Sequence, residues 1–171
     1  MADRIVIPEL CAGRPMWLIG RALAEDLAED VPKYLGLPGA KPLLGWNQAR
    51  GSATVVVVEG VFDFLTLRQW GYPVVALLGT NVRPDQVDQL RAFSRAYLVL
   101  DTDDAGFEAT LALYDAIGPT AVPVALPDDV KDPAELASRP DGQAVFAGAL
   151  LRAVGKPAPD ETSDSAPEAD L

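Results

Sequence analysis

The sequence contains no histidine and a single cysteine, Cys11, among its 171 residues. A disulfide within the chain is therefore impossible. A structural zinc ribbon is excluded as well, because such a site needs about four Cys or His ligands. This composition is typical of proteins in a reducing compartment, and we expect a cytoplasmic location.

Long hydrophobic runs are also absent. The longest apolar runs, Val55–Val58 and Val74–Leu78, are far shorter than the ~20 residues needed to span a bilayer. The first twenty residues carry four charged side chains and lack the apolar segment of a secretory signal. We therefore expect no membrane association.

Basic residues are scarce, since 14 Lys and Arg stand against 25 Asp and Glu, for a net charge of −11. This balance argues against a general nucleic-acid coat protein, in which Lys and Arg dominate binding to phosphates. Residues 1–58 are neutral overall, whereas residues 59–154 carry −7 and residues 155–171 carry −4. Any contact with a nucleic-acid backbone is thus expected in the N-terminal part, and cation binding in the acidic middle.

Apolar residues make up 49% of the chain, which is enough for a buried core. Residues 52–154 alternate between β-branched apolar runs and helical patterns, which predicts an α/β fold with a parallel sheet of roughly four strands flanked by helices. Residues 155–171 are rich in Pro, Ala, Ser and acids, and we expect a disordered acidic tail. The predicted strands are Thr54–Val58, Pro73–Leu78, Ala96–Leu100 and Ala121–Leu126.

Residues 1–51 form a separate N-terminal segment in this interpretation. Arg4–Leu10 and Met16–Leu23 read as two strands around a Gly-containing turn, which predicts a small β-hairpin. A helical turn is expected over Ala24–Asp30. Lys33–Gly39, which contains Pro and Gly, is expected to be a loop.

Acidic side chains follow three of the predicted parallel strands. Glu59 closes the first strand and Asp63 comes one helical turn later. Asp101 and Asp103 follow the third strand, and Asp132 follows the fourth. Ligands of open parallel sheets bind beyond the carboxyl ends of the strands, where like charges need a cation between them. Hard oxygen donors of this kind suit Mg²⁺ or Mn²⁺.

Some of these acids have a simpler interpretation. Aspartate at the start of a helix is often an N-cap, and Asp104 is best interpreted in this way. For Asp101 and Asp103, capping and metal ligation are both open. Asp63 is consistent with an ordinary surface residue. Glu59 is harder to explain as a cap, because Glu is a poor cap.

Four short motifs together resemble the Toprim domain of bacterial DNA primases. The apolar strand Val55–Val58 followed by Glu-Gly and then Asp63 resembles the first Toprim signature, and Asp101–Gly106 resembles the second, Asp-x-Asp-x-Ala-Gly. Leu78-Gly79-Thr80 and Lys131-Asp132-Pro133 resemble two further primase elements.

The resemblance extends into the N-terminal segment. Ile19-Gly20-Arg21 and Lys33-Tyr34-Leu35 are similar to the basic N-terminal part of the primase RNA-polymerase domain, so the resemblance covers roughly residues 4–150. Thr102 is a mild departure, because a glycine often stands between the two acids of the second signature.

The resemblance implies roles for eight residues. Glu59 would be the acid/base or metal-orienting residue, and Arg21 and Lys33 would hold template or nucleotide phosphates. Lys33 could equally be a solvated loop residue, and Arg21 could pair with an acid. The implied catalytic residues are Glu59, Asp101 and Asp103; the implied Mg²⁺ or Mn²⁺ ligands are Glu59, Asp101, Asp103, Asp132 and the supporting acid Asp63; the implied nucleotide- or nucleic-acid-binding residues are Arg21, Lys33 and Lys131.

The implied function is Mg²⁺-dependent nucleotidyl transfer, with RNA primer synthesis from NTPs on a single-stranded DNA template. A complete primase also has a zinc ribbon and a helicase-binding domain, so we expect a fragment or a small primase-like protein of a mobile element. A replicative helicase or a separate zinc-ribbon protein is then a candidate partner. Two alternatives stay open: a Toprim nuclease that uses the same acids, and a non-catalytic nucleic-acid-binding Toprim module.

Overall fold

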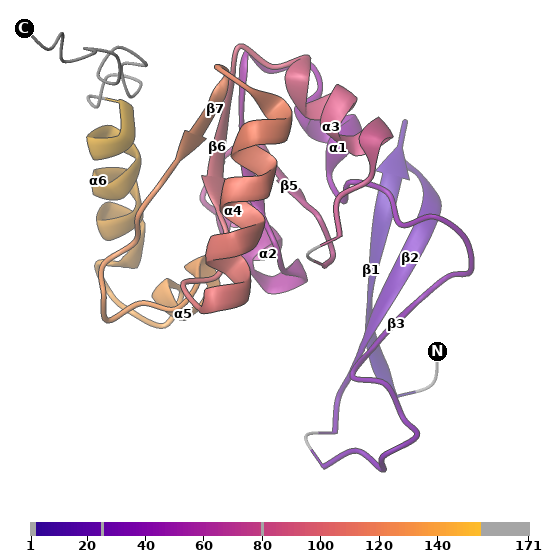
Figure 1. The fold of residues 1–171 in the computed structure, drawn as a ribbon. Coiled ribbons are helices and arrows are strands. Elements are labelled where there is room, and N and C mark those ends of the chain that lie inside the picture. The colour runs from indigo at the N-terminus through magenta and orange to yellow at the C-terminus, as the bar shows by residue number, and fades with distance from the viewer. Residues whose placement is uncertain (1–2, 25, 80, 155–171) are drawn as a thin grey trace, which may run out of the picture.

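A computed structural model describes residues 3–24, 26–79 and 81–154 (Figure 1). The tail over 155–171, which we predict to be disordered, lies outside these residues. Within the described part, every helix is too short or too polar to cross a membrane. The division of the chain near residues 51 and 154 stays a prediction.

A four-stranded parallel sheet forms the centre of the molecule, as the sequence predicts. Its strand order is β5-β4-β6-β7, with helices on both faces (Figure 1). The strands are β4 (Thr54–Val58), β5 (Val74–Ala76), β6 (Arg95–Val99) and β7 (Ala121–Pro123). The helices are α1 (Trp46–Ala49), α2 (Val61–Gln69), α3 (Pro84–Arg91), α4 (Asp104–Ile117), α5 (Pro133–Leu136) and α6 (Gly142–Val154).

Strand β4 is buried on both faces, which explains its unbroken run of valines. Val56 and Val58 belong to the core that contains side chains of α2, α5 and α6. Val55 and Val57 point the other way, into the core beneath α3 and α4. Full burial of a valine side chain contributes roughly 1.5–3 kcal/mol, so the run both selects the strand and anchors its carboxyl end.

The N-terminal segment forms a three-stranded antiparallel sheet, β1 (Arg4–Cys11), β2 (Arg14–Ala22) and β3 (Tyr34–Gly36). The predicted hairpin is confirmed, but the loop predicted over 33–39 is wrong because it contains β3. The helical turn predicted over 24–30 is also wrong, since its described residues contain only one bend and one turn and no helix. Asp26 and Asp30 would bring like charges together at i, i+4 in a helix, which disfavours that helix.

The inner face of the antiparallel sheet packs onto the parallel sheet. Ile7, Trp17 and Ile19 are buried in the same apolar core as Val56 and Val58. A buried carboxylate, Glu9, strengthens this contact: it accepts hydrogen bonds from the backbone N–H of Gly45, at 2.5 Å, and from the side-chain amide of Asn47, at 3.0 Å. Sequence reasoning did not single out Glu9.

Candidate active site

The carboxyl ends of β4 and β6 bring acids from distant parts of the sequence to one edge of the sheet. The two strands are paired in parallel, with Val58 opposite Val99. Glu59 follows Val58 directly, and Asp101 comes two residues after Val99. The pairing of two buried strands therefore fixes Glu59 beside Asp101.

Burial and the negative charges of neighbouring acids raise the pKa values of two carboxylates at this edge. Burial raises the pKa of Glu59 above its ordinary value, and the negative charges of Asp101 and Asp103 raise it further. Burial also raises the pKa of Asp101, with Asp132 and Asp103 adding to the effect and the Lys131 ammonium opposing it. The three strand ends thus form one cluster in which negative charge is unfavourable without a cation.

Lys131 supplies the nearest positive charge in the described cluster. Its Nζ lies 3.6 Å from Oδ2 of Asp101, and the neighbouring carboxylates, Asp101 first, raise its pKa. The backbone of the same residue is also tied to this edge, because its carbonyl accepts a hydrogen bond from the N–H of Thr102 at 3.2 Å. Lys131 therefore belongs to the acidic cluster, although its exposed side chain also faces solvent.

Asp103 and Asp132 both cap helices. One oxygen of Asp103 accepts from the N–H of Gly106 at 2.9 Å, and Asp132 accepts from the N–H of Glu135 at 2.9 Å. The interpretation of Asp104 as the cap of α4 is wrong, because Asp103 occupies that position. A cap engages one carboxylate oxygen, so the second oxygen of each cap is left for another ligand.

Gly106 shows why the second motif ends in glycine. A Cβ on this residue would lie 2.1 Å from the carbonyl oxygen of Asp101. Such an approach is impossible for any other residue without a backbone shift, so the glycine lets α4 begin directly against the Asp101 loop.

Asp63 differs from the other acids because its side chain is buried. Its Oδ2 accepts from the N–H of Gly60 at 3.1 Å, and its Oδ1 accepts from the N–H of Ala134 at 2.9 Å. Burial raises its pKa to about 6, against the opposing effect of the Ala134 bond. The structure therefore places Asp63 beneath the cluster rather than at its surface.

The donor set fits a magnesium ion that keeps most of its water. Within residues 3–24, 26–79 and 81–154, no three His, Cys, Asp or Glu side chains are gathered closely enough to chelate one ion. All the donors at this edge are carboxylate oxygens, which Mg²⁺ prefers. Mg²⁺ is usually held by one or two carboxylates together with water and substrate phosphates, so a spread cluster is compatible with it.

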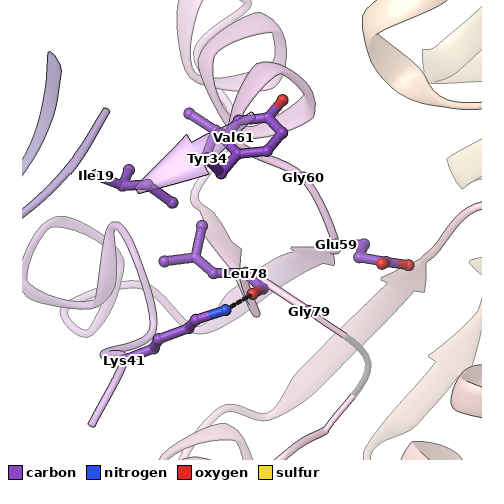
Figure 2. Close-up of a pocket in the computed structure, with 8 residues that line it drawn as sticks. All are labelled: Ile19, Tyr34, Lys41, Glu59, Gly60, Val61, Leu78 and Gly79. Atoms are coloured by element: carbon purple, nitrogen blue, oxygen red, sulfur yellow. Dashed lines mark hydrogen bonds between the residues drawn. The ribbon is translucent and has the colours of Figure 1, made fainter. Parts of the chain in front are cut away.

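A cleft of about 260 Å³ opens beside Glu59, between the two sheets (Figure 2). Its lining combines Glu59, Gly60 and Val61 after β4, the Leu78–Gly79 turn after β5, Ile19 and Tyr34 from the antiparallel sheet, and Lys41. Figure 2 shows Glu59 and Lys41 at opposite ends of this cleft. The cleft thus joins a carboxylate, an ammonium group and apolar walls.

Sequence reasoning missed Lys41 as a site residue. Its Nζ donates to the carbonyl oxygen of Leu78 at 2.8 Å, which turns the ammonium into the cleft (Figure 2). The contact spans 37 positions along the chain. No local pattern marks Lys41; the only signal is that residues 1–58 are neutral overall, whereas the middle of the chain is acidic.

Leu78 adopts a backbone conformation that is rare for a branched side chain, with φ of 61°. Its N–H donates to the carbonyl of Glu59 at 3.0 Å while its carbonyl accepts from Lys41. Left-handed backbone costs a non-glycine residue roughly 1–2 kcal/mol. The strained turn holds Lys41 and the end of β4 together across the cleft.

The other two predicted basic residues, Arg21 and Lys33, form no ion pair with the acids among the described residues. The Arg21 guanidinium lies 5.9 Å from the ring centre of Tyr34 and 5.6 Å from that of Phe62, and it donates to the Ala22 carbonyl at 2.7 Å. Lys33 is exposed just before β3, and its carbonyl accepts from the N–H of Ala22. The structure therefore brings Arg21 against α2, one residue from Asp63, while Lys33 faces solvent.

The fold and the site together define a Toprim-like α/β domain, and the profile of the Toprim-like family matches residues 56–137. A DNA primase of Clostridium acetobutylicum is 34% identical over 167 residues, covering 89% of this chain and 27% of that protein. The chain therefore contains a Toprim domain of the bacterial, DnaG-type DNA primase kind.

Solved primase structures share this fold beyond the Toprim core. The zinc-binding and RNA polymerase domains of the Aquifex aeolicus primase superpose with a TM-score of 0.73 at 28% identity, over 88% of this chain and 40% of that one. A DnaG primase catalytic domain bound to single-stranded DNA gives a TM-score of 0.71 at 29% identity, over 88% of this chain and 52% of that one. The chain spans about a quarter of the length of the Clostridium primase.

Proposed function

We propose that this chain provides the metal- and phosphate-binding part of a primase-type active site, which joins nucleoside triphosphates into RNA on single-stranded DNA. The observation that carries the proposal is the acidic edge of β4 and β6 next to a cleft that contains Lys41. Similarity to a primase catalytic domain bound to single-stranded DNA supports this choice of template.

The chemistry needs a proton acceptor. In nucleotidyl transfer a hydroxyl oxygen attacks the α-phosphorus, the bond to the β-phosphate breaks, pyrophosphate leaves and the hydroxyl proton is taken up. Glu59 is the proposed acceptor, since burial and neighbouring acids raise its pKa and make it a better base than an ordinary carboxylate. Glu59 lines the cleft in which we propose that the substrate binds.

The remaining residues would bind and orient the substrates. Asp101, Asp103 and Asp132 would hold Mg²⁺ or Mn²⁺ through oxygens that their caps and ion pairs leave free. When bound, the metal would orient the triphosphate and neutralise its charge. Lys41 and Lys131 would hold phosphate oxygens from two sides of Glu59. Arg21 and Lys33 stay proposed contacts for the template or nucleotide.

An incubation with single-stranded DNA, labelled NTPs and Mg²⁺ or Mn²⁺ tests the proposal. We expect short oligoribonucleotides whose formation falls at least about 100-fold in Glu59→Gln, as for loss of a general base. The control Asp115→Asn, an exposed carboxylate at the far end of α4, should keep wild-type activity. Cutting of the DNA without synthesis would show instead that the protein is a nuclease. Binding of DNA without any activity would show that it is a non-catalytic binding module.

The partners beyond DNA and NTPs also belong to this proposal. A replicative helicase, or a separate protein that supplies a zinc ribbon, would complete a primase that used this domain. Co-purification with either partner would support this part, and independence of primer synthesis from both would remove it.

A further inference from the structure

Asp63 joins two segments that carry other residues of the site. Its Oδ2 accepts from Gly60, next to Glu59, and its Oδ1 accepts from Ala134, 71 positions further along the chain. Helices α2 and α5 lie against each other, so the contact is part of a packed interface (Figure 1). With only 5% of its surface exposed, Asp63 has little access to solvent or to a ligand.

The bond to Ala134 completes the start of α5. The first residue of this helix, Pro133, has no N–H, and the third, Glu135, donates to the cap Asp132. Ala134 carries the remaining N–H of this short first turn, and Asp63 accepts from it. A buried amide without a partner costs about 1–3 kcal/mol, so α5 is held where Asp63 can reach it.

The position of α5 in turn decides where Lys131 and Asp132 lie. Lys131 donates its N–H to the Glu135 carboxylate at 2.9 Å, and its ammonium lies 3.6 Å from Asp101. A shift of the first turn of α5 relative to α2 would therefore move Lys131 and Asp132 together, away from the ends of β4 and β6.

Gly60 has no side chain, which leaves space for the same contact. A Cβ on Gly60 would lie 2.5 Å from Oδ2 of Asp63, closer than real Cβ contacts allow. The Glu-Gly-x-x-Asp spacing thus places an acceptor at the right point of α2 and removes the side chain that would displace it.

We propose that Asp63 is a positioning residue rather than a metal ligand: it fixes the Lys131–Asp132 segment against the Glu59–Gly60 turn. The catalytic part of this inference rests on the proposed function. The structural part, which concerns two named amides and the response to Mg²⁺, can be measured without any activity.

Amide hydrogen exchange of the variant Asp63→Asn tests the structural part. Asn offers one acceptor oxygen and one NH₂ donor, so either Gly60 or Ala134 must lose its acceptor. We expect that amide to exchange at least about 5-fold faster, the effect of losing roughly one hydrogen bond. The control Asp115→Asn should leave both amides unchanged.

A Mg²⁺ titration followed at the amide of Thr102, between Asp101 and Asp103, separates positioning from ligation. Asp63→Asn should keep a saturable response with a weakened Kd, because the carboxylates at the surface stay in place. The second variant, Gly60→Ala, keeps every carboxylate and displaces only the Asp63 contact. It should reproduce the faster amide exchange, and it covers the case in which Asp63→Asn does not fold.

The rate of primer synthesis per folded molecule adds a further test, because a residue with a purely structural role would not change it. Per folded molecule, kcat of both variants should fall about 10-fold, as for a displaced reacting group. Unchanged exchange at Gly60 and Ala134 with complete loss of the Mg²⁺ response in Asp63→Asn alone would overturn the proposal and make Asp63 a ligand. If the wild-type chain makes no primers, the proposed function fails while the exchange and Mg²⁺ data still decide the role of Asp63.

Discussion

The parallel sheet is buried on both faces, whereas the antiparallel sheet packs one face on the core and turns the other to solvent. Val55 and Val57 of β4 are fully buried, while Val6, Met16 and Leu35 of the antiparallel sheet are 43%, 67% and 42% exposed. The strands of the parallel sheet are thus held in place by packing on both faces. The second depends on one packed face and a few polar contacts.

The two sides of the candidate site contribute residues of opposite charge. The parallel sheet presents the acids Glu59 and Asp101, while Arg21 comes from the antiparallel sheet and Lys41 from the segment that follows it. The cleft lies where they meet. The buried strands hold the acids of the proposed reacting centre, and the cations on the other side suit the docking of phosphates.

The largest expected effect concerns the acidic edge. The double variant Asp101→Asn plus Asp103→Asn removes two charges, while Asn retains the ability to cap α4. Primer synthesis should fall at least about 100-fold, because the carboxylates proposed to hold the metal ion against the triphosphate are lost. Labelled-NTP incorporation measures this effect. Activity within about 2-fold of the control Asp115→Asn would show that the acidic edge is not the reacting centre.

The two sheets should differ in how strongly they tolerate truncation of a side chain. Leu98→Ala, in buried β6, should lower the free energy of unfolding by ~2–5 kcal/mol. Met16→Ala, on the exposed face of β2, should change it by less than ~0.5 kcal/mol. Urea unfolding measures both. Equal losses would mean that the exposed face is covered in solution.

Stability without Mg²⁺ should fall as pH rises through the acidic range. Folding raises the pKa of Asp63 from 3.8 to about 6. Between these two pH values, Asp63 is therefore largely protonated in the folded chain and ionised in the unfolded chain. The resulting contribution to the free energy of unfolding is fully present below pH 3.8 and is lost above about pH 6. At ~1.4 kcal/mol per pKa unit, the loss amounts to ~3 kcal/mol. Glu59 and Asp101 act in the same direction.

Chemical unfolding at a series of pH values checks this sign. Asp63→Asn should remove the largest part of the slope between pH 4 and pH 6, and saturating Mg²⁺ should reduce the part due to Glu59 and Asp101. A stability that rises with pH over this range would contradict the burial of Asp63.

A smaller effect is expected where the two sheets are joined. Glu9→Gln keeps the size of the side chain but removes the charge that accepts from Gly45 and Asn47, which should cost ~1–3 kcal/mol. The control Glu29→Gln, on an exposed residue, should be neutral. Thermal unfolding compares the two variants, and equal melting temperatures would show that Glu9 does not hold the sheets together.

The sequence predicts the parallel sheet and the N-terminal hairpin but not β3, for physical reasons. Continuous apolar runs are required by burial on two faces, so Thr54–Val58 identifies β4 without any partner. Strand β3 is three residues long and depends on its pairing with β2. The burial of Glu9 and the direction of Lys41 depend on contacts 36 to 38 positions away, which no local pattern encodes.

The site follows the same division. The sequence indicates Glu59 and Asp101 because each closely follows a recognisable strand, and Asp103 because it lies two residues after Asp101. The sequence identifies Asp63 as a candidate site residue but does not show that it is buried. Its burial depends on α5, whose start lies 70 positions further along the chain. The roles of Arg21, Lys33 and Lys131 as phosphate contacts stay predictions, since a surface cation gives no sign of its ligand.

The thermal shift caused by Mg²⁺ tests most directly whether the acidic edge is a cation site. Wild-type protein should gain a few degrees in millimolar Mg²⁺, because a cation that binds only the folded state stabilises it by RT ln(1 + [L]/Kd). The variant Asp101→Asn plus Asp103→Asn should melt at the same or a higher temperature without Mg²⁺, since repulsion among the carboxylates is relieved, and should gain nothing when Mg²⁺ is added. A variant that melts lower without Mg²⁺ and gains as much from Mg²⁺ as the wild type would contradict the account.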